Sequence, residues 1–397
     1  MTVDKQPPLP HVAFVDQTGQ LGGAELSLLD VIRSYPGKKR AVLFEDGPFA
    51  EALRFSQIET HVCPLGKRAS AVRKQAGLVS KVSAVGDLLD HRRRLKQLLR
   101  GCDVVYTNTA KALVAGALAN LGSGRKLIYH LRDMINASHF SSHNRRLLVT
   151  LANRCASRVI ANSAATADAF VAAGGRQSAV EVVYNGFDLM PFDAARAASD
   201  ESRITLRREL DTPLDARVVA VVGRLAAWKG QHVAVDALAQ MESVHLWIVG
   251  DALFGEDDEY RDLLQRLVNE KSLHSRVHFL GQRTDVLDIL QAVDVVAHCS
   301  TAPEPFGRVL VEGMLSRRPL VASRAGGALE IVSHGETGLL AEPGNADDLA
   351  VQIRRLFEES GLAARLVDQA ERSAAERFGL PEIATQINQI ITTAASG

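Results

Sequence analysis

The chain has 397 residues and a formal net charge of zero, because 46 Lys and Arg balance 46 Asp and Glu. This length exceeds what one hydrophobic core usually covers, so two domains are expected. Hydrophobic residues at 46% and charged residues at 23% are ordinary for a globular protein, and the zero net charge argues against a nucleic-acid binder that relies on a strongly basic body.

The cysteines Cys63, Cys102, Cys155 and Cys299 are scattered without C-x-x-C spacing. They are expected to be buried thiols in a reducing cytoplasm, with no metal site implied. No apolar run approaches the length needed to span a bilayer, and the N-terminal residues lack the apolar core of a signal peptide. The expected location is the cytoplasm, with peripheral contact to the inner face of the cytoplasmic membrane as an open addition.

A strand is predicted over residues 11–15, followed by a glycine-rich loop over 17–25 and an amphipathic helix. Such a loop lets the backbone approach a ligand and points the N–H groups of the helix at it. Gly22 and Gly23 are therefore candidates for phosphate binding. A plain tight turn is an equally supported alternative, since the loop is neither G-x-G-x-x-G nor a Walker loop.

Further strands are predicted over residues 41–44 and 60–63, and basic residues gather after them. They occupy the segment 67–74 and a helix with the cations Arg92, Arg93, Arg94 and Lys96. Such residues most often form a solvated face. The alternative is contact with anionic lipid headgroups or an acidic acceptor, at about 1 kcal/mol for each cation near a membrane.

Strands predicted over residues 102–108, 126–131 and 158–162 continue the alternation of strand and helix that is typical of a doubly wound sheet. His130 falls at the carboxyl end of its strand, where open α/β sheets bind ligands. A lone histidine there is usually structural. The first half closes with an apolar run and the turn pair Asn185-Gly186.

Residues 189–204 are polar and rich in alanine, so a surface linker with a short helix is expected. The second half restarts with a β-branched run over 217–222, which is typical of a buried parallel strand. Gly223, Arg224 and Lys229 follow it at a strand-to-helix junction. The two cations could converge on one diphosphate, Arg as a planar fork and Lys as a point charge.

Four more strands are predicted over residues 246–251, 277–281, 293–298 and 319–323. The acidic run 256–259 is expected to be a solvated helix start, where acids suit the helix dipole. No D-x-D triplet occurs in the chain, so a Mg or Mn clamp has no obvious ligands. We therefore expect neither a metal nor any other cofactor.

The stretch 300–312 carries two carboxylates around a predicted helix start. Pro305 disfavours a helical conformation for Glu304, whereas a helix with apolar residues on one side is predicted from Gly307, which places Glu312 on it. Unpaired N–H groups at Gly307 and Arg308 would suit a phosphate. A carboxylate can accept hydrogen bonds from adjacent hydroxyls, so the pair could hold a sugar on one side of a diphosphate and a ribose on the other.

The run Pro-Glu-Pro-Phe-Gly-Arg-Val over 303–309, with Glu312 in register, resembles the donor-site signature of the GT-B glycosyltransferases. Among these enzymes, the run most closely resembles the retaining GT4 family (glycosyltransferase group 1, E-x7-E type). Other parts of the family pattern follow in order, at Gly22-Gly23, His130, Gly223-Arg224 with Lys229-Gly230, and Gly326–Glu330.

The resemblance implies an α/β GT-B fold, in which two Rossmann-like, doubly wound parallel-sheet domains face a cleft. The expected divisions are 1–187 for an N-terminal acceptor-side domain, 188–375 for a nucleotide-sugar-binding domain, and 376–397 for a helix that packs back on the first domain. Variable loops of the first domain, notably 64–90 and 133–147, would select the acceptor.

The resemblance also implies roles for residues of the site. His130 and Glu304 would contact the donor sugar, and Arg224 and Lys229 would neutralise the leaving diphosphate. Glu312 would bind the ribose, and the backbone near Arg283 would hold the nucleobase edge. The remaining donor-binding candidates are Gly22, Gly23, Gly223, Pro305, Phe306, Gly307, Arg308 and Val309.

The resulting hypothesis is a retaining hexosyltransferase that uses a nucleoside-diphosphate sugar, with UDP-glucose favoured by family frequency. Its acceptor would be a saccharide or a lipid-linked saccharide of a surface polysaccharide or glycolipid. The alternatives are a GDP-mannose-dependent mannosyltransferase, a GT-B sugar-nucleotide epimerase and a non-catalytic GT-B partner protein. No nucleic-acid partner is expected.

Overall fold

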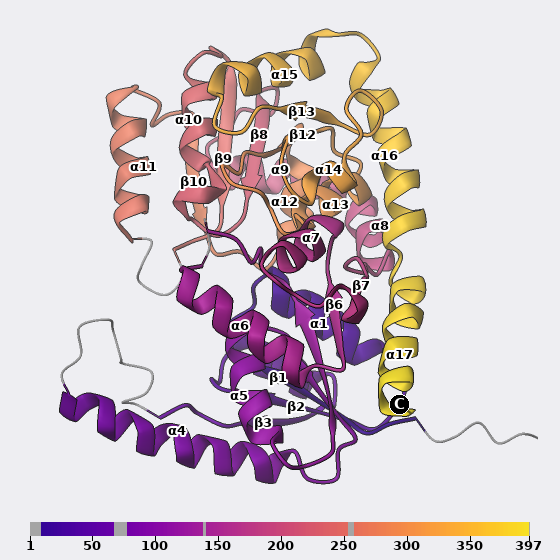
Figure 1. The fold of residues 1–397 in the computed structure, drawn as a ribbon. Coiled ribbons are helices and arrows are strands. Elements are labelled where there is room, and N and C mark those ends of the chain that lie inside the picture. The colour runs from indigo at the N-terminus through magenta and orange to yellow at the C-terminus, as the bar shows by residue number, and fades with distance from the viewer. Residues whose placement is uncertain (1–8, 67–77, 138–139, 253–257, 397) are drawn as a thin grey trace, which may run out of the picture. The chain divides into compact units, whose positions relative to one another are not determined.

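The computed structural model describes residues 9–66, 78–137, 140–252 and 258–396. The chain divides into two compact units (Figure 1). Unit 1 comprises Met1–Gly186 and Leu380–Gly397, and unit 2 comprises Phe187–Gly379. The units divide after residues 186 and 379, whereas the sequence-based divisions were placed after residues 187 and 375.

In the described part of unit 1, seven strands form a parallel sheet with the order β3-β2-β1-β4-β5-β6-β7. The strands are β1 Val12–Asp16, β2 Lys39–Leu43, β3 Glu59–Val62, β4 Val104–Thr107, β5 Lys126–Leu131, β6 Arg158–Ala161 and β7 Val180–Val182. The strand order reverses between β1 and β4, and the crevice outside the carboxyl ends at such a switch point is where open α/β sheets bind ligands.

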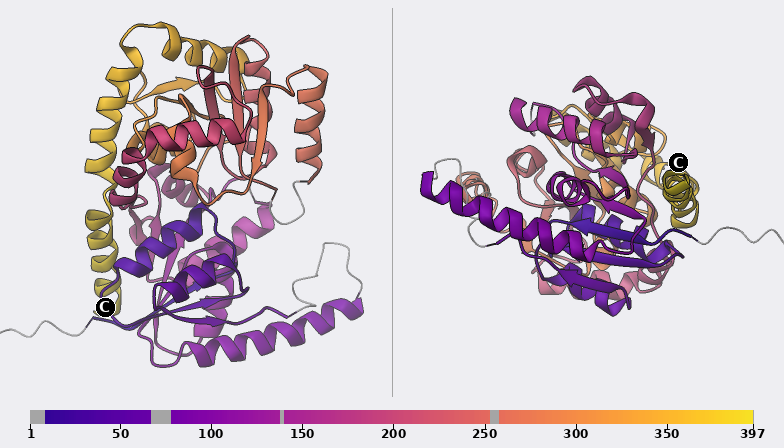
Figure 2. Two further views of the ribbon diagram at one scale, coloured as in Figure 1. Left: turned by 180° about the vertical axis from the view of Figure 1, so that it is seen from behind. Right: turned by 60° about the horizontal axis from the view of Figure 1, so that its bottom comes forward.

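Helices cover both faces of this sheet. They are α1 Gly23–Ser34, α2 Pro48–Phe55, α4 Leu78–Leu98, α5 Ala110–Asn120, α6 Ser142–Cys155, α7 Ala164–Ala172 and α17 Leu380–Ser396, with the 3₁₀ turn η1 Gln177–Ala179. Figure 2 shows α1 and α17 on the same face. Helix α17 buries Ile383, Ile387 and Ile391 against Phe14 and Ile128 of the strands. The last helix of the chain is thus part of the core of unit 1.

In the described part of unit 2, six parallel strands have the order β10-β9-β8-β11-β12-β13. They are β8 Arg217–Val222, β9 Val244–Val249, β10 Val277–Gly281, β11 Val295–His298, β12 Leu320–Ser323 and β13 Leu339–Ala341. The predicted strands 217–222 and 277–281 are confirmed to the residue. The first is a near-continuous apolar run with a buried interior, as expected for a strand covered on both faces, whereas the second is a partly exposed edge strand. Two doubly wound parallel sheets confirm the predicted fold class.

The helices of unit 2 are α8 Met190–Ala197, α9 Ser199–Glu209, α10 Gln231–Leu238, α11 Asp258–Glu270, α12 Val286–Ala292, α13 Arg308–Leu315, α14 Ala328–Ile331, α15 Ala346–Glu358 and α16 Leu362–Phe378, with the 3₁₀ turn η2 Ala227–Lys229. One core cluster joins β8, β9 and β11 to α10, α11 and α15. Asp258 and Glu259 lie in the first turn of α11, as expected for acids at a helix start. The other two acids of that run lie outside the described residues.

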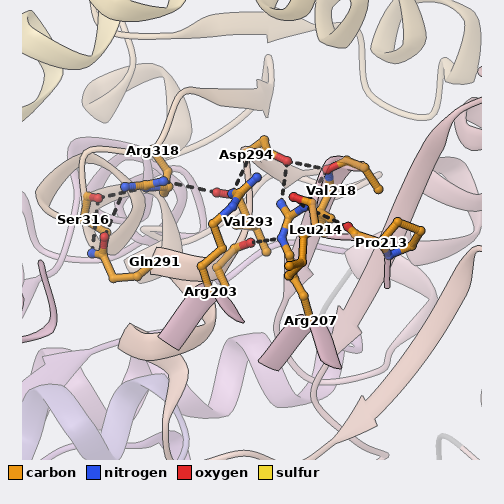
Figure 3. A network of polar contacts seen from close by, with 12 residues as sticks. Arg203, Arg207, Pro213, Leu214, Val218, Gln291, Val293, Asp294, Ser316 and Arg318 are labelled. Atoms are coloured by element: carbon orange, nitrogen blue, oxygen red, sulfur yellow. Dashed lines mark hydrogen bonds and ion pairs between the residues drawn. The ribbon is translucent and has the colours of Figure 1, made fainter. Parts of the chain in front are cut away.

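Residues 189–204 contain the expected short helix, α8, but not the expected linker, because α9 occupies the rest of the segment. Helix α9 is anchored by Arg207, whose side chain is fully buried and donates hydrogen bonds to the carbonyl oxygens of Ala216 at 2.6 Å and Ala292 at 3.0 Å. It also pairs with Asp294 at 2.8 Å (Figure 3). Because a charged residue occupies a core position of this helix, its apolar repeat is interrupted, and hydrophobic periodicity did not predict it.

The predictions for the cysteines are confirmed in three of four cases, and those for the two basic segments are tested only in part. Cys63, Cys102 and Cys299 are buried free thiols, as expected, but Cys155 is half-buried. The basic segment 67–74 lies outside the described residues. The second basic group is on α4, where Arg93 and Lys96 are exposed.

Candidate functional site

Helix α13 begins at Arg308, which confirms the predicted helix start. Gly307 is its N-cap residue, Glu304 lies on the loop before it, and Glu312 lies in the second turn. The first N–H groups of a helix have no acceptor within the helix, and they carry partial positive charge. The two carboxylates therefore flank a backbone feature that suits a phosphate.

The carboxylate of Glu304 lies at the centre of a polar cluster. Lys229 Nζ donates to both of its oxygens, at 2.8 Å to Oε1 and 2.7 Å to Oε2. His298 Nε2 lies 3.1 Å from Oε2, and Ser300 Oγ donates to the same oxygen at 3.0 Å. Burial alone would raise the pKa of this carboxyl, but the Lys229 ammonium and the contact with His298 outweigh it and hold the pKa well below its usual range. Glu304 is therefore ionised at neutral pH.

Lys229 reaches Glu304 because the loops after two neighbouring strands run side by side. Strand β8 pairs with β11, and beyond their ends the N–H of Thr301 donates to the carbonyl of Trp228 at 2.8 Å. The turn η2 then places Lys229 at its last residue. The structure thus brings together Lys229 and Glu304, which are 75 residues apart in the chain.

His298 and Ser300 are members of this cluster that the sequence analysis missed. His298 is the last residue of β11, and both side chains are buried, with exposed fractions of 4% and 1%. A signal was present, because a histidine that ends an otherwise apolar strand lies at the edge of the sheet where ligands bind. That signal was used for His130 but not for His298.

A second turn supports the loop of Glu304. Gly326 pairs with Glu304 through an isolated β-bridge, and the N–H of Gly327 donates to the Glu304 carbonyl at 2.7 Å. Gly326 has φ of +62°, and a Cβ added there would lie 2.7 Å from the backbone nitrogen of Glu304. Only glycine fits this close backbone approach without displacement. The downstream Gly-Gly pair therefore fixes the position of Glu304.

Glu312 forms a different pair. Its Oε1 accepts a hydrogen bond from Arg308 Nε at 3.2 Å, and the Arg308 guanidinium stacks over the ring of Phe187 at 4.4 Å. Phe306 points into the core of unit 2, where it packs edge-to-face on Phe378. Pro305 and Val309 are half-buried beside them. Of Phe306, only the backbone is placed to meet a ligand.

Gly223 and Arg224 follow the end of β8. The Arg224 carbonyl accepts a hydrogen bond from Gln231 Nε2 at 2.9 Å, which ties the loop to α10. Its guanidinium forms no ion pair with any residue of the described ranges, and it is half-buried. Its chemistry suits the predicted binding of a diphosphate, which stays a prediction.

The side chain of Arg283 is held by carboxylates. It forms a two-pronged pair with Asp285, at 2.8 and 2.6 Å, and a third contact with Glu209 at 2.9 Å. These groups line an open hollow of about 290 Å³ together with Glu201 and Asp288. An acidic hollow does not suit a phosphate. The prediction for this turn concerns its backbone at the nucleobase edge, and it stays a prediction.

In unit 1, Gly22 caps α1 and Gly23 is its first residue. Glu25 accepts a hydrogen bond from the Gly22 N–H at 3.0 Å. Burial, and then the charge of Asp16, raise the pKa of Glu25 to about 8. The loop therefore has the capped helix start of a tight turn, and phosphate binding by it stays a prediction.

His130 is buried at the penultimate position of β5. Its Nδ1 contacts the hydroxyl of Tyr106, and its Nε2 has no hydrogen-bond partner among the described residues. Burial, and then the charge of Arg132, hold its pKa well below the usual range, so the ring is neutral. The ring borders a cavity of about 10 Å³, which is room for one water molecule. Contact between His130 and a donor sugar stays a prediction.

No group of three or more His, Cys, Asp or Glu side chains among the described residues is placed to hold a metal ion. None of the helices in the described ranges combines the length and the apolar character that crossing a bilayer requires.

Family models match both halves of the chain. The model for a glycosyl transferase 4-like domain matches residues 23–186, and the model for glycosyl transferases of group 1 matches residues 202–373. These matches agree with the motifs of both units.

Similar proteins are also known. The crystal structure of Anabaena Alr3699/HepE in complex with UDP-glucose is 40% identical with a TM-score of 0.88, and the match covers 97% of this chain and 100% of that one. The lipopolysaccharide core biosynthesis glycosyltransferase LpsE of Rhizobium meliloti is 32% identical over 187 residues, which are 47% of this chain and 53% of LpsE. The chain thus spans about half the length of the curated relatives that it matches.

Sucrose-phosphate synthase from Thermosynechococcus elongatus shares the fold, with a TM-score of 0.77 at 20% identity over 96% of this chain and 98% of that one. Two parallel sheets of this kind are the GT-B arrangement, which confirms the resemblance inferred from the motif around Glu304. The chain belongs to the group 1 glycosyl transferases, the GT4-type branch of the GT-B fold.

Proposed function

We propose that this protein is a retaining hexosyltransferase that moves glucose from UDP-glucose to a saccharide or lipid-linked saccharide, in the synthesis of a surface polysaccharide or glycolipid. The 40% identical relative that binds UDP-glucose supports the donor, and LpsE supports the kind of pathway. The observation that carries the proposal is the ionised Glu304 paired with Lys229 beside the start of α13.

The chemistry requires stabilisation of the leaving group. Cleavage of the anomeric bond develops positive charge on the sugar ring and negative charge on the departing diphosphate, so preorganised donors around the phosphates lower the barrier most. Arg224, Lys229 and the N–H groups at the start of α13 would serve as those donors. Glu312 would bind the ribose and would exchange its contact with Arg308 for the ribose hydroxyls.

Glu304 would accept hydrogen bonds from hydroxyls of the donor sugar, and His130 would contact the same sugar. For retention, we infer that the acceptor attacks on the face of the leaving group and that the phosphate takes the acceptor proton. Glu304 as a covalent nucleophile is the weaker alternative, because its carboxylate already accepts contacts from Lys229, His298 and Ser300.

The donor is tested by thermal shift and by release of nucleoside diphosphate. We expect UDP-glucose to raise the melting temperature more than UDP-galactose or GDP-mannose does, since a ligand that binds only the folded state stabilises it. Proton NMR of an early product should show a retained anomeric configuration, and formation of a second sugar nucleotide without acceptor would indicate an epimerase. No shift with any sugar nucleotide would refute the proposal.

No metal is expected in this mechanism, because the cations named above would supply the charge. Transfer activity in excess EDTA should equal that in its absence. A loss that added Mg or Mn restores would show that a metal takes part.

We also propose a cytoplasmic location with weak contact to anionic membranes. Exposed Arg93 and Lys96 lie near the half-exposed Leu88 and Leu89 on α4, a combination that suits an interface. Co-sedimentation with phosphatidylglycerol liposomes should occur at low salt and disappear at high salt. Absence of co-sedimentation at low salt would refute the proposed membrane contact.

A further inference from the structure

The cluster around Glu304 contains two kinds of donor. Lys229 is partly accessible, with 22% of its side chain exposed, whereas His298 and Ser300 are buried. A lysine that grips a diphosphate, as the proposed function requires, has to share or give up its contacts with Glu304. Glu304 itself is buried at 6% exposure, and a buried charge that loses its partners is strongly disfavoured.

His298 and Ser300 are placed to prevent that loss. His298 Nε2 and Ser300 Oγ both lie within 3.1 Å of Oε2 of Glu304 and 3.1 Å from each other, so the three groups form a closed triangle. The Ser323 hydroxyl donates to the His298 carbonyl at 3.2 Å, which fixes the end of β11 to β12. The triangle is therefore anchored at the end of β11, which β12 holds, and none of its three contacts involves Lys229.

The other ring nitrogen of His298 gives no competing explanation for this residue. Nδ1 is buried and has no hydrogen-bond partner among the described residues. A buried polar atom without a partner destabilises a fold, and the rest of β11, Val295–Ala297, is apolar. The polar contacts of this ring are thus made with Glu304 and Ser300 alone, as far as the described residues show.

We propose that His298, supported by Ser300, is a positioning residue that keeps the Glu304 carboxylate oriented toward the donor sugar while Lys229 engages the diphosphate. This inference rests on the proposed function for its catalytic consequence but not for the coupling between His298 and Glu304. It separates two tasks within the cluster. Lys229 responds to the nucleotide, and His298 holds the carboxylate.

The coupling is tested first, by a double-mutant cycle of His298→Leu and Glu304→Gln in urea unfolding. We expect the two changes to be non-additive by about fivefold or more in the unfolding equilibrium constant, because residues in one hydrogen-bond network couple. The matched control is His245→Gln, another buried histidine of the same sheet, whose ring contacts His278. It should be additive with Glu304→Gln, and additivity of His298→Leu as well would overturn the inference.

The catalytic role is tested next. His298→Leu should lower kcat/KM for UDP-glucose by about tenfold or more while the dissociation constant for UDP, which lacks the sugar, changes by about threefold or less. His298→Gln should restore part of the activity, because its amide nitrogen can replace Nε2 as a donor. Unchanged kcat/KM in His298→Leu, or equal loss of UDP binding and activity without rescue by Gln, would overturn the positioning role.

The urea double-mutant cycle and the activity assays together distinguish failure of the inference from failure of the proposed function. If the wild type neither binds nor consumes UDP-glucose, the proposed function fails. The urea cycle still decides whether His298 holds Glu304. If the wild type is active and the cycle is additive, the inference fails alone.

Discussion

Replacing Lys229 by methionine tests both the stability and the chemistry of the cluster. The change removes the ammonium but keeps the length of the side chain, and it leaves Glu304 with His298 and Ser300 as neighbours. Removing one partner of a buried ion pair costs about 3–5 kcal/mol. Because 22% of the Lys229 side chain is exposed, we expect the lower end, about 3 kcal/mol of unfolding free energy.

The pH dependence of stability should change as well. In the wild type the pKa of Glu304 is depressed, so its ionised form contributes stability above the unfolded pKa of about 4.3, and this is lost as the pH falls toward the depressed value. Without Lys229, burial is the main remaining influence and raises the pKa. The variant should then lose stability as the pH rises from about 4.3 toward neutrality.

Urea unfolding across about pH 4 to 8 is the assay for stability, because this range runs from the ordinary carboxyl pKa to beyond neutrality. The control is Lys271→Met, which breaks an exposed pair with Asp236 at 3.0 Å and should cost about 0–1 kcal/mol. Adding Glu304→Gln to Lys229→Met should recover most of the lost stability, since the buried group that His298 and Ser300 hold in place then carries no charge that lacks a cation. A Lys229 variant as stable as the Lys271 control would refute the reasoning.

Activity should respond differently from stability. Loss of one donor to a developing charge costs about 3–4 kcal/mol of barrier, or about 10²–10³-fold in rate. We expect Lys229→Met and Arg224→Ala to fall in this range, and the double variant with Glu304→Gln to remain inactive despite its restored stability. Activity within a few-fold of wild type in both single variants would contradict the assignment of the diphosphate to these cations.

Three further outcomes follow from single residues. Arg207→Met should destabilise unit 2 by about 3 kcal/mol, because it leaves the buried acceptors of a fully buried guanidinium unpaired; a melting temperature equal to that of the wild type would contradict this. Glu25→Gln should be more stable than the wild type at alkaline pH. The pKa of Glu25 is raised to about 8 in the folded protein, so the wild type keeps the stability from this group below the ordinary pKa and loses it as the pH rises through 8. Parallel pH profiles of the two proteins in urea unfolding would contradict this. Gly326→Ala should lose activity because its Cβ would collide with the backbone of Glu304. The control Gly335→Ala, at φ of +79° with open space around it, should only lower stability by about 1 kcal/mol. Equal activities of the two variants would show that the turn does not position the carboxylate.

Much of the fold could be predicted because the sheets are parallel and buried. Runs such as residues 126–131 and 217–222 are apolar on both faces, so strand and loop separate clearly in the sequence. The start of α13 was predictable because Pro305 and Gly307 act locally on the backbone. The second helix of segment 189–204 was not predicted because its anchor, Arg207, depends in part on partners about 85 residues away, such as Ala292, which no local pattern contains.

The sequence supplied candidate residues for the site but not the contacts between them. Glu304 and Lys229 were assigned separately to sugar and diphosphate, and their direct contact follows only from the pairing of β8 with β11. The backbone near Arg283 was expected to hold the nucleobase edge, and the contacts of its side chain with Asp285 and Glu209 were not foreseen. Tertiary neighbours decide such contacts, and a single sequence does not specify them.

The state of Glu304 also bears on how the anomeric configuration would be kept. A nucleophilic carboxylate needs an available lone pair at the moment of attack, whereas Oε2 of Glu304 is surrounded by Lys229, His298 and Ser300 within 3.1 Å. The same donors that lower its pKa lower its basicity, and with it the strength of the bond that it could form to an anomeric carbon. They leave intact its ability to accept a hydrogen bond from a sugar hydroxyl at Oε1, which contacts only Lys229 among the described residues. If Lys229 moves to the diphosphate, as proposed, that oxygen would become the better acceptor, and binding of the leaving group would strengthen the hydrogen bond between Glu304 and the sugar.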